Sequence, residues 1–117
     1  FASEKELLEG MRDAIKCHQS LLRSAGILHR DISPNNIMLY NPEDSDTLAS
    51  DLPKGFLIDL DLAKYIGPNT TTADGTLNGV RRRTGTMLFM AIEILMVTCS
   101  RHCWRHDLES FLYVLIW

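Results

Sequence analysis

Apolar residues recur at helical spacing through the first part of the chain. Between Ser3 and Ala25 they return every three or four positions, and the charged residues fall mostly on the opposite side. Ser3 and Glu6 form a capping-box pattern, and Gly26 stands where the end of a helix favours a left-handed residue. The pattern predicts one long helix over Ser3–Ala25 that packs one face against a core, with His18 as a packing residue.

Beyond this helix the pattern changes to short apolar runs separated by polar turns. The runs Ile27–Leu28, Ile37–Tyr40 and Phe56–Ile58 are typical of β-strands. The last two flank a polar stretch, so we expect them to pair as an antiparallel hairpin across a surface loop. Residues 65–83 are rich in Gly, Thr and Asn without periodicity, which predicts a mobile loop, and an apolar helix begins near Asp107. These elements predict an α+β fold that is mostly α.

Composition and charge exclude several classes of protein. The chain has 12 basic and 15 acidic residues, a net charge of −3, and Arg81–Arg83 is its only basic cluster, so we expect no nucleic-acid partner. Its apolar runs fall far short of the ~18 residues that a membrane span needs. Its 3 cysteines, an odd number, argue against a disulfide framework and for a reducing, intracellular compartment.

The length and the two ends of the chain indicate part of a larger unit. The 117 residues suffice for one small domain. The chain begins at Phe1 rather than at Met and ends at Trp117 within an apolar run, so we expect an internal part of a longer domain. The apolar residues over Leu112–Trp117 then need covering by the rest of that domain or by another chain.

Polar residues that can carry chemistry follow two of the predicted strands. His29, Arg30 and Asp31 come directly after the first strand, and Asn36 follows Asp31 by five residues. Asp59 comes directly after the second arm of the predicted hairpin. We expect the hairpin to bring Asp31, Asn36 and Asp59 together. Oxygen ligands of this kind suit Mg²⁺, which takes one or two carboxylates together with phosphates and waters.

A second set of possible metal ligands precedes the last helix. Its members have side chains that suit Zn²⁺ and a spacing that would place them on one face of a helix: Cys99, His102, Cys103 and His106. Structural zinc sites usually draw ligands from two separated elements, and Trp104 crowds this segment. We therefore favour ordinary helix or loop residues here and keep zinc as the alternative.

Four motifs together resemble the fungal-type protein kinases. HRDISPNN over residues 29–36 resembles the kinase catalytic loop, and IDLDLAK over residues 58–64 resembles the metal-binding Asp-Phe-Gly segment. GTMLFMAIE over residues 85–93 resembles the end of an activation segment, and RHDLESFLYVLIW over residues 105–117 resembles the start of the central helix. The resemblance implies a partial protein kinase domain over residues 1–117, a piece of the C-terminal lobe without the ATP-binding lobe or the final helices.

The resemblance implies a catalytic and metal-binding role for three of these residues. Asp31 would orient the substrate hydroxyl and accept its proton. Asn36 and Asp59 would hold Mg²⁺ on the phosphates of ATP. The partners of the parent domain would then be ATP and a protein substrate.

Other residues would support or regulate the site. Asp107 would brace the backbone of the His29–Arg30 loop, and Arg30 would order the activation segment by taking up a phosphothreonine. Within the activation segment Thr86 would line the substrate side, which favours Ser/Thr hydroxyls, and Glu93 would pair with an Arg of a later helix. The candidate phosphorylation sites are Thr70, Thr71, Thr72, Thr76 and Thr84.

The motifs depart from the usual kinase pattern at three places. Ser33 is a candidate catalytic residue, but it stands where Ser/Thr kinases usually have a Lys that neutralises the transferring phosphoryl group, and it offers only a hydroxyl there. Leu60 and Asp61 replace Phe-Gly, which removes the backbone freedom of Gly. Asp61 is either a further metal ligand or a solvated turn residue. Ile92 replaces the Pro of Ala-Pro-Glu.

The sequence predicts a Ser/Thr protein kinase, with two alternatives. One is a small-molecule kinase of the aminoglycoside or choline type, which shares a related Asp…Asn…Asp core, although GTMLFMAIE argues against it. The other is a non-catalytic pseudokinase or interaction module. The isolated chain is expected to be inactive, because it carries no Gly-rich loop, strand Lys or helix Glu of the nucleotide-binding lobe.

Overall fold

The computed structural model describes residues 3–40, 51–67, 86–96 and 101–117. Helix α1 (Glu4–Ser20) begins at Ser3, whose Oγ accepts a hydrogen bond from the Glu6 amide at 3.2 Å. A single π-helical turn, η1 (Leu21–Ala25), continues it to Gly26, which adopts a left-handed φ of 64°. The predicted extent of this helix is confirmed, but its last turn is wider than an α-helical turn.

Within the described residues, four short strands form two antiparallel pairs. β2 (Ile37–Leu39) pairs with β3 (Gly55–Leu57), which confirms the predicted hairpin. β1 (Ile27–Leu28) pairs with β4 (Lys64–Tyr65), and the sequence did not indicate this second pair. The loop predicted from residue 65 onward therefore begins later, because Tyr65 lies in a strand, and residues 68–85 lie outside the described residues.

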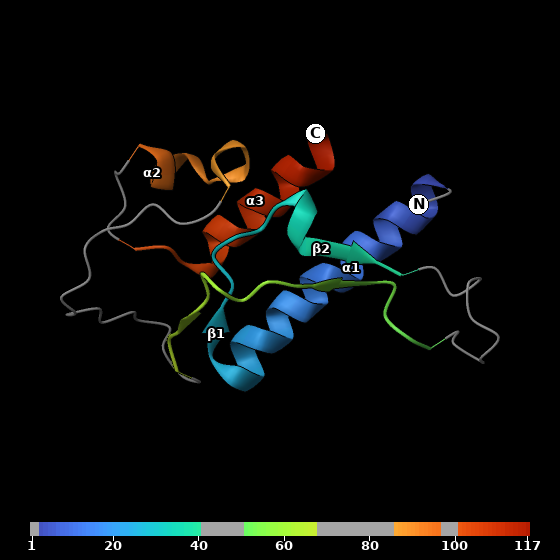
Figure 1. Ribbon diagram of the computed structural model, residues 1–117, viewed down its shortest axis with the longest axis horizontal. Helices are drawn as coiled ribbons and strands as arrows, with labels where there is room; N and C mark the ends of the chain where they lie inside the picture. Colours follow the sequence, from blue (N-terminus) through green and yellow to red (C-terminus); the bar gives the residue numbers. More distant parts are fainter. Residues whose placement is uncertain (1–2, 41–50, 68–85, 97–100) are drawn as a thin grey trace.

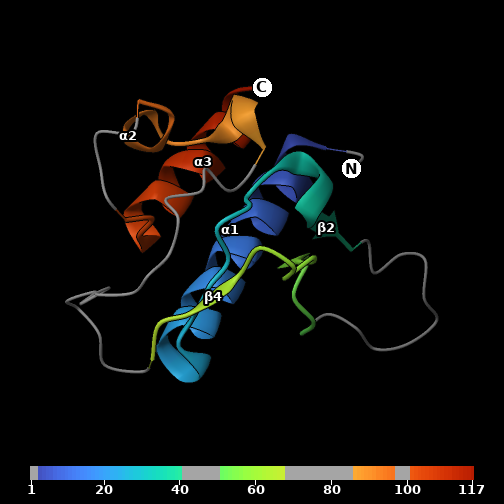
Figure 2. The same ribbon diagram turned by 60° about the vertical axis from the view of Figure 1, so that its left-hand side comes forward.

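The remaining elements in the described part of the chain are two short turns and two helices. The 3₁₀ turns are η2 (Pro34–Asn36) and η4 (Met87–Phe89). The helices are α2 (Ile92–Leu95) and α3 (Trp104–Ile116), so the last helix begins three residues earlier than predicted. α1 and α3 lie side by side and run in opposite directions, and the β2–β3 pair lies along α1 (Figure 1). α2 lies beside α3, away from the strands (Figure 2). The chain is thus an α+β structure, about half helical, with two short antiparallel sheets.

The core lies where α1, α3 and the loop after β1 meet. Met11 and Ala14 of α1 pack with Ile32 of the loop and Phe111 of α3, and all four are buried. Partly buried residues pack against this cluster from α1, the β2–β3 pair and α3: Leu7, Ile37, Leu57 and Val114. Because Ile32 is anchored in this core, its neighbour Asp31 is fixed at the edge of the molecule.

Asp13 of α1 fixes the chain that leads into β3. Its Oδ2 accepts a hydrogen bond from the Lys54 amide at 2.9 Å, and its Oδ1 accepts one from Arg12 Nε at 2.9 Å. The bond from Arg12 and the bond from the Lys54 amide hold the pKa of Asp13 below its ordinary value. The Lys54 ammonium also pairs with Glu9. These contacts place β3 directly on α1.

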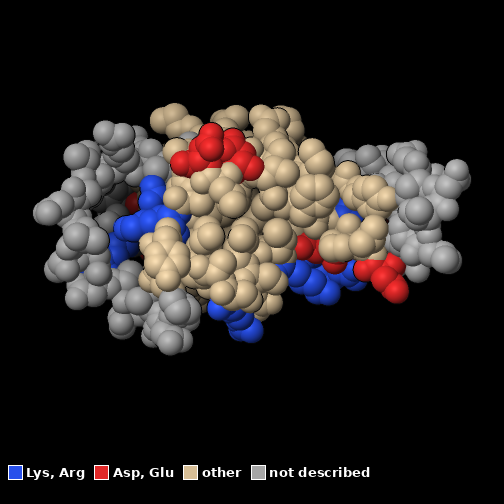
Figure 3. Space-filling model, turned by 60° about the horizontal axis from the view of Figure 1, so that its bottom comes forward, with Lys and Arg blue, Asp and Glu red and all other residues tan. Residues whose placement is uncertain are grey.

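The outer surface is mostly uncharged on the face shown in Figure 3. On this face the basic and acidic side chains of the described residues lie in small separate groups, with broad uncharged areas between them. None of the helices that the structure describes combines the length and the apolar character needed to cross a bilayer.

Candidate active site

Asp31 lies on a loop that leaves β1 and returns to β2. Arg30 adopts a left-handed φ of 71°, which turns the chain sharply after the buried residues Leu28 and His29. After this turn Asp31 is half-buried and Ile32 is buried. Pro34 opens the 3₁₀ turn that ends the loop. The loop therefore presents one carboxylate from a backbone that is anchored on both sides.

Asn36 fixes this carboxylate from the far end of the same loop. Its Nδ2 donates to the backbone oxygen of Asp31 and to Asp31 Oδ2, both at 2.9 Å. The two bonds close the loop across five residues and direct the Asn36 amide oxygen away from Asp31. Asn36 is 7% exposed, so its orientation is fixed by the fold rather than by solvent.

Thr86 reaches the same carboxylate from a distant part of the sequence. Its backbone amide donates to Asp31 Oδ1 at 3.0 Å, and its hydroxyl donates to the same oxygen at 3.2 Å. Thr86 caps the 3₁₀ turn η4, so the turn is positioned directly against Asp31. Asp31 is therefore held by Asn36 of its own loop and by Thr86 of the motif over residues 85–93.

His29 connects this loop to the end of β3. Its Nδ1 accepts a hydrogen bond from the Asp31 amide at 3.2 Å, so the proton of the neutral ring lies on Nε2, which donates to the Ile58 carbonyl at 2.9 Å. The Ile58 amide donates in turn to the Asn36 carbonyl at 2.9 Å. Ile58 is thus bound to both ends of the Asp31 loop, and Asp59 is the next residue.

Asp59 lies on the solvent side of this junction. It adopts a left-handed φ of 62°, and its Oδ1 accepts a hydrogen bond from the Asp61 amide at 3.2 Å. Asp and Asn tolerate this conformation better than other residues with a Cβ. The exposed Asp59 carboxylate and the Asn36 amide oxygen are hard oxygen donors, and the Ile58 bonds hold their two segments together. This donor set fits Mg²⁺.

Asp107 joins α3 to α1 and to the Asp31 loop. Its Oδ2 accepts hydrogen bonds from His18 Nε2 at 2.8 Å and from the Arg30 amide at 3.2 Å. Its Oδ1 accepts one from His102 Nε2 at 2.7 Å. Burial raises the pKa of Asp107, but the bonds from His102 and His18 outweigh it and hold the pKa well below its ordinary value. The Asp31 loop is therefore tied to both long helices through one buried carboxylate.

A model of the fungal protein kinase family matches residues 1–117 of this sequence. The chain belongs to the fungal protein kinase family. No curated protein matches it. In this member of the family the four motifs lie around one loop, because Asp31 contacts Thr86 of the third motif and the Arg30 amide contacts Asp107 of the fourth.

Two further residues predicted for the kinase site lie in defined surroundings. Ser33 is 1% exposed and, within the described part of the chain, its hydroxyl has no hydrogen-bond partner. Its catalytic role stays a prediction. Glu93 Oε2 lies 2.9 Å from His106 Nε2, and its side chain is 63% exposed. Its pairing with an Arg of a later helix also stays a prediction. Thr84 lies outside the described residues.

The zinc alternative is not supported in this kinase chain. Helix α3 begins at Trp104, so His102 and Cys103 precede it rather than share a helical face with His106. His102 is bound to Asp107, and His106 Nδ1 accepts a bond from the Cys103 amide. Across the described ranges no three His, Cys, Asp or Glu side chains are placed to hold a metal ion, and Cys99 lies outside these ranges.

Three residues that hold the candidate site together were not assigned to it by the sequence. His18 and His102 hold Asp107, and Ile58 holds the two loops together through its backbone. A histidine on the apolar face of α1 was a weak signal for His18, because a buried imidazole needs a partner. No side-chain pattern marks Ile58, since only its main-chain atoms form the bonds.

Proposed function

We propose that this chain supplies the catalytic loop, the metal-binding segment and the end of the activation segment to the C-terminal lobe of a protein kinase. The reaction would transfer the γ-phosphoryl group of ATP to a Ser or Thr hydroxyl of a protein substrate. The observation that carries this proposal is the convergence of Asn36 and Thr86 on the Asp31 carboxylate, and Asp59 directly follows Ile58, whose backbone is bonded to His29 and Asn36 of the same loop. Membership of the fungal protein kinase family supports the same reaction class.

The hydrogen bonds around Asp31 leave room for one substrate hydroxyl. An ionised carboxylate offers about four lone-pair positions. Thr86 occupies two of them on Oδ1, and Asn36 occupies one on Oδ2. The remaining position on Oδ2 would accept the hydroxyl proton of the substrate as its oxygen attacks phosphorus. The three donors would keep the carboxylate in one orientation during the reaction.

Asp59 and Asn36 would hold Mg²⁺ on the phosphates of ATP. When bound, Mg²⁺ supplies positive charge that stabilises the charge of the transferring group and the leaving group. The chain contributes the oxygen donors, and the bonds of Ile58 to His29 and Asn36 hold their two segments together. Asp61 is exposed and follows Asp59 by two residues, so it is a candidate for a further ligand.

Thr86 and Arg30 would connect substrate choice and regulation to this site. The Thr86 hydroxyl is bonded to Asp31 Oδ1, and we propose that Thr86 lines the substrate side of the site and favours Ser/Thr hydroxyls. Arg30 precedes Asp31 and is only partly exposed, and we propose that it binds a phosphothreonine of the activation segment. The 117 residues carry no Gly-rich phosphate loop, so nucleotide binding would depend on an ATP-binding lobe that contains such a loop.

The test is phosphoryl transfer by the complete gene product. With Mg²⁺ and labelled ATP, we expect label on a protein substrate such as casein. Replacing the proposed base, Asp31→Asn, should lower kcat by about 10²–10⁴-fold, the range typical of a lost general base. The matched control is Asp51→Asn, an exposed carboxylate, which should leave kcat unchanged.

Two other outcomes would reject this function. Label on a small alcohol and none on protein would indicate a small-molecule kinase. Saturable binding of Mg·ATP in calorimetry without any transfer would indicate a non-catalytic module. An Asp31→Asn variant with the wild-type kcat would remove Asp31 from the mechanism even if transfer to protein were observed.

A further inference from the structure

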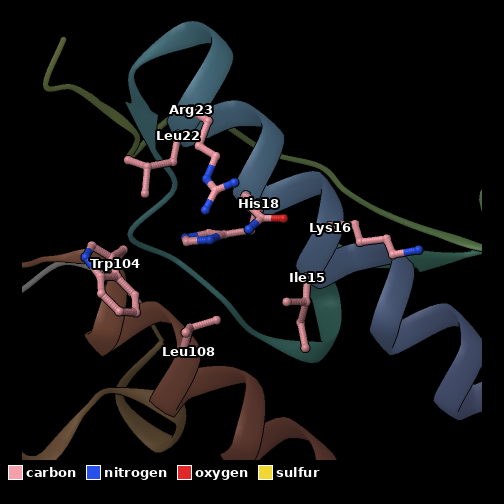
Figure 4. Close-up of a pocket in the computed structure, with 8 residues that line it drawn as sticks. Ile15, Lys16, His18, Leu22, Arg23, Trp104 and Leu108 are labelled. Atoms are coloured by element: carbon pink, nitrogen blue, oxygen red, sulfur yellow. The ribbon is translucent and has the colours of Figure 1, made fainter. Parts of the chain in front are cut away.

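A cavity lies between the second half of α1 and the first half of α3, away from Asp31. Figure 4 shows its lining residues on the two helices. Its volume is about 440 Å³, within the range of about 300–1,000 Å³ that is usual for small-molecule sites. The residues that line it are Ile15, Lys16, His18, Gln19, Leu22, Arg23, Trp104 and Leu108.

One wall of the cavity is apolar and includes an aromatic ring. Trp104 and Leu108 of α3 face Ile15 of α1 across the space (Figure 4). Trp104 is 47% exposed, and Ile15 and Leu108 are each 37% exposed, so apolar surface is open to solvent here. A flat apolar ligand that covered these side chains would remove this surface from water.

The charge of the cavity is positive. Its lining includes Lys16 and Arg23 and no carboxylate. In Figure 4 the Arg23 guanidinium points into the space between the helices, toward His18, while Lys16 points outward. Arg105 adds a third positive charge, because its guanidinium lies over the Trp104 ring at 5.8 Å from the centroid. The acid behind His18, Asp107, is buried and already accepts three hydrogen bonds.

The floor of the cavity is connected to the Asp31 loop. His18 lines the cavity and is 3% exposed, and its Nε2 binds Asp107 Oδ2 at 2.8 Å. The same Asp107 oxygen accepts the Arg30 amide at 3.2 Å. A ligand that displaced the His18 ring would remove one hydrogen bond from Asp107 Oδ2. This is the oxygen that also accepts the hydrogen bond of the Arg30 amide, next to Asp31.

We propose that this cavity binds a small organic anion with a flat apolar body, and that its occupancy is transmitted to the Arg30 backbone through His18 and Asp107. The apolar body lies against Trp104 and Leu108, and the anionic group pairs with the Arg23 guanidinium. The site is separate from the proposed kinase site, and its binding does not depend on phosphoryl transfer.

The experiment follows the indole N–H signals of the ¹⁵N-labelled chain while 2-naphthoate is added. The sequence has 2 tryptophans, so Trp117→Phe identifies the Trp104 signal. We expect the Trp104 signal to shift saturably. The neutral analogue 2-naphthalenemethanol should bind at least about tenfold more weakly, because a hydrogen bond to a charged partner is lost.

Two variants locate the anionic group. Arg23→Gln should weaken 2-naphthoate binding at least about tenfold and leave binding of the neutral alcohol unchanged. The matched control Lys5→Gln removes an exposed positive charge of α1 outside the cavity and should not change either affinity. Both positions are exposed, and amide spectra that overlay the wild-type spectrum would show that each variant is folded.

Three results would overturn the proposal. The site is rejected if the Trp104 signal does not shift saturably. It is also rejected if Arg23→Gln and Lys5→Gln bind 2-naphthoate equally well, because the anion then lies elsewhere. A saturating Trp104 signal without any shift of the Arg30 amide would keep the binding site and reject its connection to the Asp31 loop.

Discussion

Asp107 joins three segments through one side chain. Its two oxygens accept hydrogen bonds from His18, His102 and the Arg30 amide, and the residue is completely buried. Hydrogen bonds to a charged group contribute more than neutral ones, and a buried donor that loses its partner is costly. The stability of the chain should therefore depend on the charge of this carboxylate.

We expect Asp107→Asn to lower the free energy of unfolding by about 2–3 kcal/mol at neutral pH. Since folding lowers the pKa of Asp107, its contribution is fully present above the ordinary value of 3.8 and is lost as the pH falls further. The difference between wild type and variant should thus shrink below about pH 4. Urea unfolding at several pH values measures it, with the exposed Asp51→Asn as control. A difference that does not change with pH would contradict the prediction.

For single residues, the sequence was sufficient to locate the acidic side chains of the candidate site, but not the residues that hold them in place. Asp31 and Asn36 stand at recognisable spacing, and Asp59 follows a strand of the predicted hairpin. The histidine partners of Asp107 depend on how α1 packs against α3, and no local pattern encodes this packing. Ser33 shows the same limit, because whether its hydroxyl meets substrate or core depends on which way the loop turns at Arg30.

Among the elements, β3 approaches α1 closely at two glycines. A Cβ placed on Gly55 would overlap the Gly10 carbonyl group, which is backbone and cannot move alone. A Cβ placed on Gly10 would overlap the end of the Leu39 side chain, while the Lys54 carbonyl oxygen lies at ordinary contact distance. The contact between strand and helix therefore requires glycine at position 55 more than at position 10.

We expect Gly55→Ala to destabilise the chain by about 1–3 kcal/mol, the usual effect of overpacking. Gly10→Ala should cost less, because Leu39 can change its rotamer and Ala favours a helix by about 1 kcal/mol over Gly. Thermal unfolding followed by circular dichroism would measure both variants. Equal losses of stability at the two positions would contradict this geometry.

α2 is fastened to α3 by side chains at its first turn. Glu93 Oε2 lies 2.9 Å from His106 Nε2, and the Ile92 amide donates to Glu109 Oε1 at 3.0 Å. His106→Gln should open this turn more often, because one hydrogen bond contributes about 1 kcal/mol. We expect the Ile94 and Leu95 amides to exchange about fivefold faster with deuterium, and the Met11 amide to exchange at its original rate. Unchanged exchange at Ile94 would show that the His106 bond does not hold α2.

The elements themselves were largely predictable, and their partners were not. The first helix and the β2–β3 hairpin follow from local periodicity and turn residues. The pairing of β1 with β4 was missed because it joins Ile27 to Tyr65 across more than thirty residues, and two-residue strands carry no pattern. The last helix was placed three residues late, because Trp104 to His106 have side chains that are equally common in loops.

Across the whole molecule, the far end of α3 leaves apolar side chains uncovered. Leu112 is 52% exposed and Ile116 is 72% exposed, one turn apart on the same side of the helix. Trp117 follows at 82% exposed. A contiguous apolar surface of this kind usually binds another surface.

We expect the isolated chain to self-associate through this surface. The double variant Leu112→Gln/Ile116→Gln should lower the average mass in sedimentation velocity, because it removes apolar area without touching the core. Leu8→Gln, a change at an exposed leucine of α1, serves as the control and should leave the mass unchanged. A wild-type chain that stays monomeric at every concentration would contradict the prediction.

The bonds of Ile58 have a consequence for how freely this site can change during evolution. Ile58 takes part in them only through its own main-chain atoms, so almost any replacement of Ile58 would preserve them. Proline alone would remove the N–H that reaches Asn36. The residues after Asp59 could thus diverge to Leu60 and Asp61 while the acid kept its place beside the loop. Position 58 should therefore tolerate most substitutions but not proline, because the main chain rather than the side chain holds the site together.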